Sequence, residues 1–449
     1  MNRLFGTDGV RGVANTELTP ELAFKLGKVV SFFLSKNKGR SRVLIGKDTR
    51  LSGDLLENSI SAGIMSMGGD VLKAGIIPTP AVAHLIREMK TDAGIMISAS
   101  HNTFEFNGIK IFNSDGFKLD DDLEDEIENI IVRNMDLDGH LTGEEIGRCY
   151  EIEDEAKEHY INFLKNTVDL DLRGKKIAVD CANGAAYEIA SRVLMDLGAE
   201  PLVINNKPNG ININERSGST HPEELQRYVL AEKADIGLAF DGDADRLISV
   251  DEKGRLIDGD RMIYICAKML KKQNRLIGNK VTATVMSNIG FHRAIESIGA
   301  TVDTTQVGDR YVLEKMLKTG CVIGGEQSGH IIFLEDSTTG DGMLSALQLL
   351  KSIQLSGKKF SELADEMTIY PQVLRNAAVK NENKKKYSSD RDIVEEIKRI
   401  ENYMCGEGRV LIRPSGTEPL IRVMIEGKDL GEITNLAEGL SALIEKNMS

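Results

Sequence analysis

The sequence lacks the features that membrane-spanning, secreted and nucleic-acid-binding chains need. None of its apolar runs reaches the ~18 residues of a membrane-spanning helix, so no membrane partner is expected. Residues 1–12 contain no apolar core and already carry Asp8 and Arg11, so no signal peptide is expected. The 69 acidic residues outnumber the 56 basic ones, giving a formal net charge of −13. Because phosphate backbones are bound mainly by cations, this charge argues against a nucleic acid as partner.

Cysteine is scarce and scattered. The chain has 5 cysteines with no C-x-x-C pair and no grouping with histidine: Cys149, Cys181, Cys266, Cys321 and Cys405. This spacing excludes the usual zinc sites and a disulfide framework, and it predicts reduced thiols in a cytoplasmic protein. The sequence also shows no low-complexity tract and no long linker.

An ordinary globular composition, with 41% hydrophobic and 28% charged residues over a length of 449, predicts about three domains. One pattern begins near residues 42, 177 and 281. It consists of a strand, a turn, a helix, a glycine-containing stop and a second strand. It is typical of a right-handed βαβ unit. We therefore expect an α/β protein with three similar mixed-sheet βαβ domains, at 1–150, 151–253 and 254–366. Residues 367–449 predict a separate α+β domain.

Residues 241–246 read DGDADR and follow an apolar strand at 236–240. Three carboxylates at alternate positions, Asp241, Asp243 and Asp245, can converge on one hard divalent cation. An EF-hand is a poor match, although Glu252 falls at its twelfth position, because Arg246 stands where that loop needs glycine and the flanks read as strands. A compact set of three carboxylates indicates magnesium, which shares its shell with phosphate or water.

A serine follows a second apolar strand. The strand at 94–98 leads into Ala99-Ser100-His101-Asn102, which places Ser100 where open α/β sheets bind ligands. Lys110 could return to the same site as a cation or proton carrier. The chain has no G-x-S-x-G elbow, so an α/β-hydrolase is a poor match. A turn with an asparagine cap is an equally simple interpretation of this stretch.

Two further loops carry polar groups. Residues 413–419 read RPSGTEP and are followed by Arg422, a composition that can hold phosphate or simply close a rigid hairpin. Residues 324–330 read GGEQSGH, in which Glu326 and Ser328 suit sugar hydroxyls and His330 could carry a proton or contact phosphate. The glycine-rich residues 5–12 and residues 307–310 each read as a turn with one arginine.

Together these motifs resemble the α-D-phosphohexomutase superfamily, with all four signature loops in the family's order. A finer resemblance links the chain to the branch that interconverts glucosamine 6-phosphate and glucosamine 1-phosphate and thereby feeds UDP-N-acetylglucosamine synthesis. It is carried by residues 210–214 and 218–222, Gln327 and residues 338–342. Two departures touch the shape of the serine loop: Thr103, where the family often has proline, and residues 104–106.

The resemblance implies four domains around a central active-site cleft and an intramolecular phosphotransferase of the isomerase class. It implies a phosphoserine at Ser100, a 1,6-bisphosphate intermediate and one Mg²⁺ per active site. The metal ligands would be Ser100, Asp241, Asp243 and Asp245. Residues implied to bind the phosphorylated hexosamine are Glu326, Ser328, Arg413, Ser415, Gly416, Thr417 and Arg422. Candidates for acid, base and charge roles are Lys110, Arg11, His101 and His330.

Three alternatives stay open at this point. A phosphomannomutase/phosphoglucomutase would use the same chemistry on another hexose. A non-catalytic calcium-binding or sugar-phosphate-sensing protein would carry no phosphate on Ser100. A phosphatase would use Asp241 as nucleophile. The oligomeric state, monomer or homodimer, is not encoded in any motif.

Overall fold

The computed structural model describes residues 4–6, 8–38, 40–135, 137, 141–415 and 418–449. The chain divides into two compact units. The first unit comprises Met1–Met286 and Gly299–Asp365, and the second comprises Ser287–Ile298 and Glu366–Ser449. Each unit is described by itself below. Among the described residues, no helix has the length and apolar character needed to cross a bilayer.

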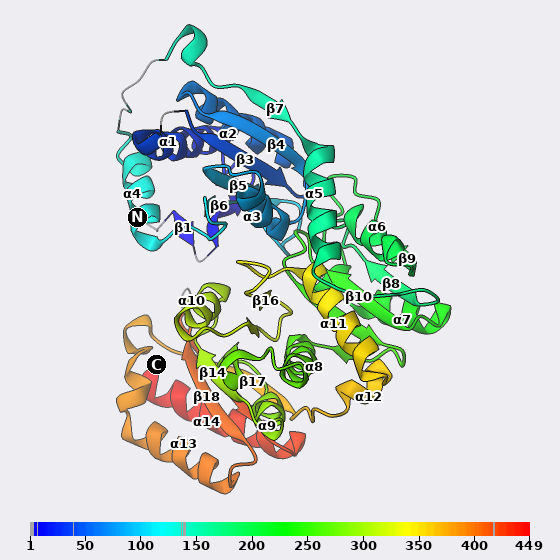
Figure 1. The fold of residues 1–449 in the computed structure, drawn as a ribbon. Helices are drawn as coiled ribbons and strands as arrows, with labels where there is room; N and C mark the ends of the chain where they lie inside the picture. Colours follow the sequence, from blue (N-terminus) through cyan, green and yellow to red (C-terminus); the bar gives the residue numbers. More distant parts are fainter. Residues whose placement is uncertain (1–3, 7, 39, 136, 138–140, 416–417) are drawn as a thin grey trace. The chain divides into compact units, whose positions relative to one another are not determined.

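The N-terminal part of the first unit is a seven-stranded mixed sheet (Figure 1). Across the sheet its strands are β1 (Phe5–Gly6), β2 (Gly9–Val13), β6 (Phe106–Asn113), β5 (Ala93–Ile97), β3 (Arg42–Lys47), β4 (Asp70–Ile76) and β7 (Cys149–Glu151). Its helices are α1 (Pro20–Lys38), α2 (Gly53–Ser66), α3 (Thr79–Glu88) and α4 (Asp121–Val132). Helices α1 and α2 pack on each other, and α3 packs on β3 and β5. The apolar side chains between these layers form a buried core that includes Val43, Ile45 and Ile95.

Two smaller mixed sheets complete the first unit. The five-stranded sheet contains β12 (Leu256–Ile257), β11 (Leu247–Asp251), β10 (Ile236–Phe240), β8 (Lys176–Asp180) and β9 (Glu200–Ile204), with helices α5 (Glu153–Asn166), α6 (Ile189–Asp196) and α7 (Glu223–Glu232). The four-stranded sheet contains β14 (Thr301–Thr305), β13 (Lys280–Thr284), β15 (Ile323–Gly325) and β16 (Ile331–Phe333), with α8 (Gly259–Lys272), α10 (Asp309–Thr319), α11 (Gly342–Ser356) and α12 (Phe360–Ala364).

The three sheets share one topology, which confirms the expected repeat of βαβ units. In each, the first two strands pair in parallel, the third adds in parallel on the other side of the first, and a fourth pairs antiparallel with the third. The orders are β4-β3-β5-β6, β9-β8-β10-β11 and β14-β13-β15-β16. The connection from the third to the fourth strand is therefore the same structural position in each sheet.

The second unit is α+β, as expected. Its three-stranded antiparallel sheet has the order β17 (Gln372–Ala378), β19 (Leu420–Glu426) and β18 (Arg409–Pro414). Its helices are α9 (Ile289–Ser297), α13 (Arg391–Tyr403) and α14 (Leu430–Met448). Side chains of β19 and α14, among them Ile421, Val423 and Leu440, form a core of their own. The boundaries of the four domains expected from the sequence are not tested by this division and stay a prediction.

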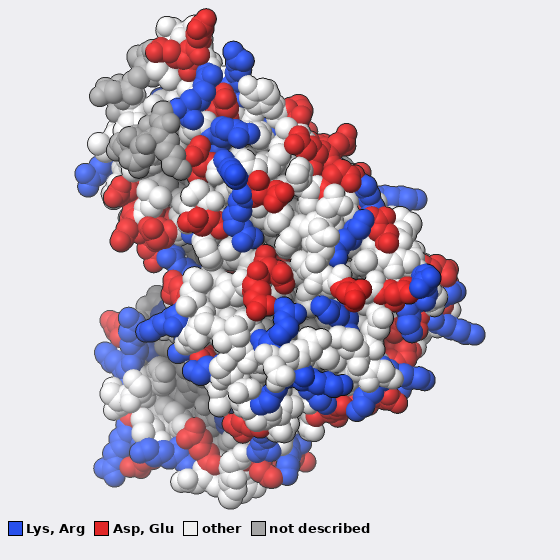
Figure 2. Space-filling view, in the orientation of Figure 1, with Lys and Arg blue, Asp and Glu red and all other residues white. Residues whose placement is uncertain are grey.

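On the face shown in Figure 2, lysine and arginine side chains are interspersed with aspartate and glutamate side chains. A mixture of both signs, rather than a continuous basic surface, agrees with the acidic net charge of the whole chain.

Candidate active site

Three of the four loops singled out in the sequence occupy the equivalent connection between the third and fourth strands. The β5–β6 connection carries Ser100, the β10–β11 connection carries residues 241–246, and the β15–β16 connection carries residues 326–330. In each case the chain leaves the carboxyl end of a parallel strand, where open α/β sheets bind ligands. Repetition of one topology therefore accounts for the similar placement of three loops that are about 85 to 140 residues apart in sequence.

Ser100 lies against the acidic loop. Its hydroxyl donates a hydrogen bond of 2.7 Å to Oδ2 of Asp241, and only 1% of the residue is exposed. Nδ1 of His101 lies 3.4 Å from the same hydroxyl. The Ser100 backbone has φ +51°, a left-handed conformation that is uncommon for a residue with a side chain. A strained, buried serine that contacts a carboxylate has the features of a functional residue rather than a simple turn.

The three aspartates converge as the sequence predicts. One carboxylate oxygen from each of Asp241, Asp243 and Asp245 lies within 4.8 Å of the others, and all three residues are buried. Oδ1 of Asp243 and Oδ1 of Asp245 have no hydrogen-bond partner among the described residues. Buried carboxylate oxygens without donors are costly unless a cation binds them. This donor set, hard oxygens only and partly unpartnered, fits a divalent metal ion.

Burial and crowding perturb the aspartates in opposite directions. Burial, followed by repulsion from Asp245 and Asp243, raises the pKa of Asp241 well above its ordinary value. Burial would also raise the pKa of Asp245, but Lys110 and His330 together hold it well below its ordinary value. Opposite shifts in the pKa values of neighbouring carboxyl groups are typical of functional sites.

Lys110 is the cation at the centre of the acidic residues. Its Nζ lies 2.8 Å from Oδ2 of Asp243, 3.1 Å from Oδ2 of Asp8 and 3.5 Å from Oδ2 of Asp245. Burial opposes its charge, yet these carboxylates raise the pKa of Lys110 well above its ordinary value. Lys110 was expected at the site from the sequence, whereas Asp8, in the glycine-rich residues 5–12, was not among the candidate site residues.

His330 is oriented by the backbone. The N–H of Gly340 donates to Nε2 of His330 over 3.0 Å, so the ring proton of the neutral imidazole lies on Nδ1. That Nδ1 is 3.6 Å from Oδ2 of Asp245. A side chain on residue 340 would overlap the ring, because a Cβ there would lie 2.5 Å from it. His330 therefore touches the acidic cluster.

The other predicted catalytic residues are less enclosed. Arg11 is exposed on β2 and forms an ion pair with Asp8. Burial, followed by the nearby Arg246 and Arg11, lowers the pKa of His101, so its imidazole is neutral near neutral pH. Arg246 lies beside Asp245, with Nε 3.7 Å from Oδ1, and its backbone N–H donates to Oδ1 of Asp241.

The predicted sugar loop forms a tight turn. Its backbone closes with hydrogen bonds from the N–H of Glu326 to the carbonyl of His330 and from the N–H of Gly329 to the carbonyl of Glu326. Oε1 of Glu326 accepts from the N–H of Gly308, and Ser328 is exposed. The first two residues of the expected loop, Gly324 and Gly325, belong instead to β15, because they pair with both β13 and β16.

The predicted phosphate loop belongs to the second unit. Arg413 on β18 and Arg422 on β19 are directly opposite each other in the antiparallel ladder, so they extend from the same face of the sheet. Ser415 follows β18, and its Oγ accepts from the N–H of Glu418. Gly416 and Thr417 lie outside the described residues.

Several residues near the acidic cluster were missed by sequence reasoning. The hydroxyl of Thr79 donates to Oδ2 of Asp243 over 2.5 Å, and Arg50 and Asn214 donate to backbone carbonyls of the serine loop. Their position in the sequence could have indicated Asp48 and Arg50, because both lie just after β3, the strand next to β5. Glu252, the twelfth position of the rejected EF-hand, accepts hydrogen bonds from Ser361 instead.

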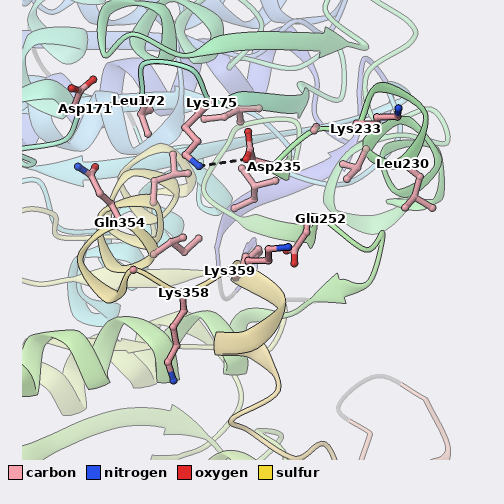
Figure 3. Close-up of a pocket in the computed structure, with 18 residues that line it drawn as sticks. Asp171, Leu172, Lys175, Leu230, Lys233, Asp235, Glu252, Gln354, Lys358 and Lys359 are labelled. Carbon is pink, nitrogen blue, oxygen red and sulfur yellow. Dashed lines mark hydrogen bonds and ion pairs between the residues drawn. The ribbon is translucent and has the colours of Figure 1, made fainter.

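A hollow of about 650 Å³ lies elsewhere in the first unit (Figure 3). It is lined by Ile236, at the start of β10, and by residues after α11, including Lys358 and Lys359. In Figure 3 the Lys175 side chain extends toward Asp235, 3.4 Å away. Because the acidic loop follows the opposite end of β10, this hollow is separate from Ser100 and the aspartates, which form the candidate active site.

The chain is similar to known enzymes over its whole length. Four domain models of phosphoglucomutase/phosphomannomutase match it: alpha/beta/alpha domains I, II and III at residues 2–137, 158–254 and 258–370, and the C-terminal domain at 374–443. It is 55% identical to the phosphoglucosamine mutase of Alkaliphilus metalliredigens and 56% identical to that of Acetivibrio thermocellus, covering 100% of each chain.

Solved structures share the fold at low identity. A phosphoglucomutase/phosphomannomutase family protein from Burkholderia thailandensis has a TM-score of 0.83 at 24% identity, with 99% of this chain and 98% of that one covered. Aspergillus fumigatus N-acetylphosphoglucosamine mutase, solved with GlcNAc-6P and magnesium, has a TM-score of 0.70 at 18% identity, with 99% and 96% covered. The chain belongs to the phosphoglucosamine mutase family and contains all four domains of the phosphoglucomutase/phosphomannomutase enzymes.

Proposed function

We propose that the chain interconverts glucosamine 6-phosphate and glucosamine 1-phosphate, with Ser100 as the carrier of the phosphoryl group. The observation that supports this most directly is the 2.7 Å hydrogen bond from the Ser100 hydroxyl to Asp241 inside a buried cluster of three carboxylates. Family membership supports the substrate, since full-length relatives at 55% identity are phosphoglucosamine mutases.

The proposed metal is one Mg²⁺ ion, held by Asp241, Asp243, Asp245 and an oxygen of phosphorylated Ser100. The two carboxylate oxygens without partners support this assignment. When bound, such an ion stabilises the negative charge that develops on a transferring phosphoryl group. The trio is too small to complete a coordination shell alone, and magnesium commonly shares its shell with phosphate oxygens.

The reaction proposed has two transfers. In the first, O1 of glucosamine 6-phosphate attacks the phosphorus on Ser100 and loses its proton to a nearby base; the P–O bond to the serine breaks, and the serine oxygen takes up a proton. The product is the 1,6-bisphosphate. After this molecule reverses its orientation, the oxygen of the Ser100 hydroxyl attacks the 6-phosphate and loses its proton to a base; the bond to O6 breaks, and O6 takes up a proton. Phosphate is thus returned to the serine, and glucosamine 1-phosphate leaves.

The surroundings of each polar residue support a division of roles. Lys110, enclosed by carboxylates, remains a cation and balances charge. His101, neutral and 3.4 Å from the Ser100 hydroxyl, is placed to accept or return a proton, with His330 as the second candidate. Arg11, exposed beside Asp8, is available to the incoming phosphate.

Substrate binding is proposed to use two loops. Glu326 and Ser328 would bind sugar hydroxyls, and Arg413, Ser415, Gly416, Thr417 and Arg422 would bind the phosphate that does not react. The paired arginines on facing strands support the second assignment, because guanidinium groups bind phosphate bidentately. Such an anchor accepts both orientations of the bisphosphate, since each presents one phosphate.

A coupled assay on the phosphates of glucosamine, glucose and mannose tests the proposed substrate. The account predicts that glucosamine 6-phosphate has the highest kcat/KM. A higher value for the glucose or mannose phosphate would assign the chain to phosphomannomutase/phosphoglucomutase chemistry instead. Release of free phosphate without isomerisation would indicate a phosphatase.

A further inference from the structure

The backbone of the serine loop is held at two carbonyl groups. Ser100 adopts φ +51°, and its carbonyl and that of Asn102 accept hydrogen bonds from buried side chains. A carbonyl oxygen has two lone pairs, so each can accept two hydrogen bonds. Each of the two carbonyls accepts one hydrogen bond from Arg50 and one from Asn214.

Arg50 contributes the first set of donors. Its Nη2 donates to the carbonyls of Ser100 and Asn102 over 3.0 and 2.8 Å, and its Nη1 donates to those of Thr103 and Phe106. Its Nε donates to Oδ2 of Asp48 over 2.9 Å. All five N–H groups of the guanidinium are thus used, four of them on carbonyls of the serine loop and the first residue of β6, and the side chain is fully buried.

Asn214 contributes the second set. Its Nδ2 donates to the carbonyls of Ser100 and Asn102 over 2.8 and 2.9 Å. Asn214 itself has φ +59°, and its backbone N–H donates a hydrogen bond to the carbonyl of Ala182. It ends residues 210–214, a segment that has no part in the proposed reaction. The N–H of Leu51, next to Arg50, donates to the carbonyl of Gly210, which links this segment to the first set of donors.

The same groups adjoin the acidic loop. A Cβ on Gly242, between Asp241 and Asp243, would lie 2.5 Å from the carbonyl oxygen of Ser100 and 2.7 Å from Nδ2 of Asn214. The serine loop, the acidic loop and the asparagine are therefore in direct contact. A shift of Asn214 would change the position of the Ser100 hydroxyl relative to the aspartates.

We propose that Arg50 and Asn214 are positioning residues that hold Ser100 in its left-handed conformation, with its hydroxyl directed at the carboxylate cluster. This inference rests on the proposed function, in which Ser100 carries the phosphoryl group. Neither residue contacts reacting atoms; both act through the Ser100 carbonyl. A small displacement of the Ser100 oxygen from its productive position lowers the rate of phosphoryl transfer. It leaves the contacts that bind the substrate in place.

The test compares the rate at which Ser100 becomes phosphorylated in three variants and the wild type. Asn214→Gly removes the amide donors but keeps a residue that accepts positive φ. Arg50→Lys keeps the charge beside Asp48 but cannot span four carbonyls. Asn205→Gly is the matched control, since Asn205 also has φ +50° and donates through Nδ2, to Asp180 and Glu224 rather than to the serine loop.

Each protein is incubated with glucose 1,6-bisphosphate and Mg²⁺, and the phosphorylated fraction is followed by intact mass. Rates are normalised to the final fraction phosphorylated, so that partial unfolding alone does not lower them; thermal unfolding is measured in parallel. We expect Asn214→Gly to react at least ~10-fold more slowly, with kcat reduced to match and KM for glucosamine 6-phosphate within ~2-fold of wild type. Asn205→Gly should match the wild type. If Arg50→Lys does not fold, Asn214→Gly alone carries the test.

An Asn214→Gly variant that is phosphorylated as fast as the wild type would overturn the positioning role while leaving the proposed function intact. A wild type that never gains a phosphoryl group would overturn the proposed function itself, and the positioning role with it. Equal slowing of phosphorylation in Asn205→Gly would also contradict the proposal. It would show that losing an asparagine side chain elsewhere in this domain slows the phosphorylation of Ser100 just as much.

Discussion

The hydroxyl of Ser100 and the carboxylate of Asp241 are joined by a hydrogen bond of 2.7 Å across 141 residues of sequence. The two residues leave the carboxyl ends of equivalent strands, β5 and β10, in two sheets of the same topology. Because β10 is followed at once by the acidic loop, the carboxylate that the serine contacts belongs to a buried cluster of three. The predictions below follow from this juxtaposition and its surroundings.

Replacing Ser100 should separate catalysis from folding. Ser100→Ala removes the proposed phosphoryl carrier and one buried hydroxyl, so we expect turnover to fall by ~10³-fold or more with little change in the unfolding temperature. The measurement is the coupled mutase assay beside thermal unfolding. Ser114→Ala, at an exposed serine in the same domain, is the matched control and should be fully active. Substantial turnover by Ser100→Ala would remove Ser100 as carrier.

Metal binding should depend on Asp243 and not on Glu252. Asp243 has a buried carboxylate oxygen without a partner, whereas Glu252 already accepts two hydrogen bonds from Ser361. Chelation should abolish turnover of the wild type, and added Mg²⁺ should restore it. Asp243→Asn should raise the Mg²⁺ concentration required by at least ~10-fold, while Glu252→Gln should not change it. Loss of cation binding in Glu252→Gln would favour the EF-hand reading instead.

Removal of Lys110 should make stability depend on the metal. Lys110→Met leaves Asp8, Asp243 and Asp245 without their shared buried cation, and breaking such an arrangement costs about 3 kcal/mol or more. Unfolding is measured with chelator and with Mg²⁺. We expect a large loss of stability that Mg²⁺ partly restores. Lys25→Met, at an exposed lysine, controls for loss of charge. Equal stability of Lys110→Met and wild type in chelator would contradict this account.

Arg422 should affect substrate affinity more than turnover. Loss of one charge-assisted contact of about 1.5–3 kcal/mol corresponds to a KM increase of roughly 10- to 100-fold for Arg422→Ala, with kcat less affected. Arg375→Ala is the control, because Arg375 lies on β17 of the same sheet and pairs with Glu438, outside the loop to which Glu418, the partner of Arg422, belongs. Unchanged KM and kcat in Arg422→Ala would remove Arg422 from the phosphate anchor.

Asp341 should give the stability of the chain a pH dependence. It caps α11 through the N–H of Leu344, and both of its oxygens accept from the Tyr160 hydroxyl. Burial, opposed only in part by these donors, raises the pKa of Asp341 from 3.8 to about 7. The folded state then binds the proton more tightly than the unfolded state, so this stabilisation is complete below pH 3.8 and is lost as pH rises toward 7.

The measurement is urea unfolding between pH 5 and pH 7.5. Relative to Asp341→Asn, which keeps a capping side chain but cannot ionise, the wild type should lose up to ~1.4 kcal/mol per pH unit over the part of this range below the folded pKa. Parallel pH profiles for the two proteins would show that Asp341 does not titrate in this range.

Local sequence patterns predicted the acidic loop well, because its three aspartates lie within five residues and need no distant partner to be recognised. The repeated βαβ pattern likewise predicted the three sheets. Arg50 and Asn214 could not be predicted in the same way, since their partners are backbone carbonyls 50 to 114 residues away. Gly324 and Gly325 looked like loop residues, but pairing with strands on both sides places them in β15.

The most direct test of the central claim is phosphopeptide mapping of wild-type protein incubated with a hexosamine 1,6-bisphosphate and Mg²⁺, then treated with glucosamine 6-phosphate. The account predicts a phosphoryl group on the peptide that contains Ser100, stable to acid and lost when the monophosphate is added. A label on Asp241, or no label that the monophosphate removes, would contradict it.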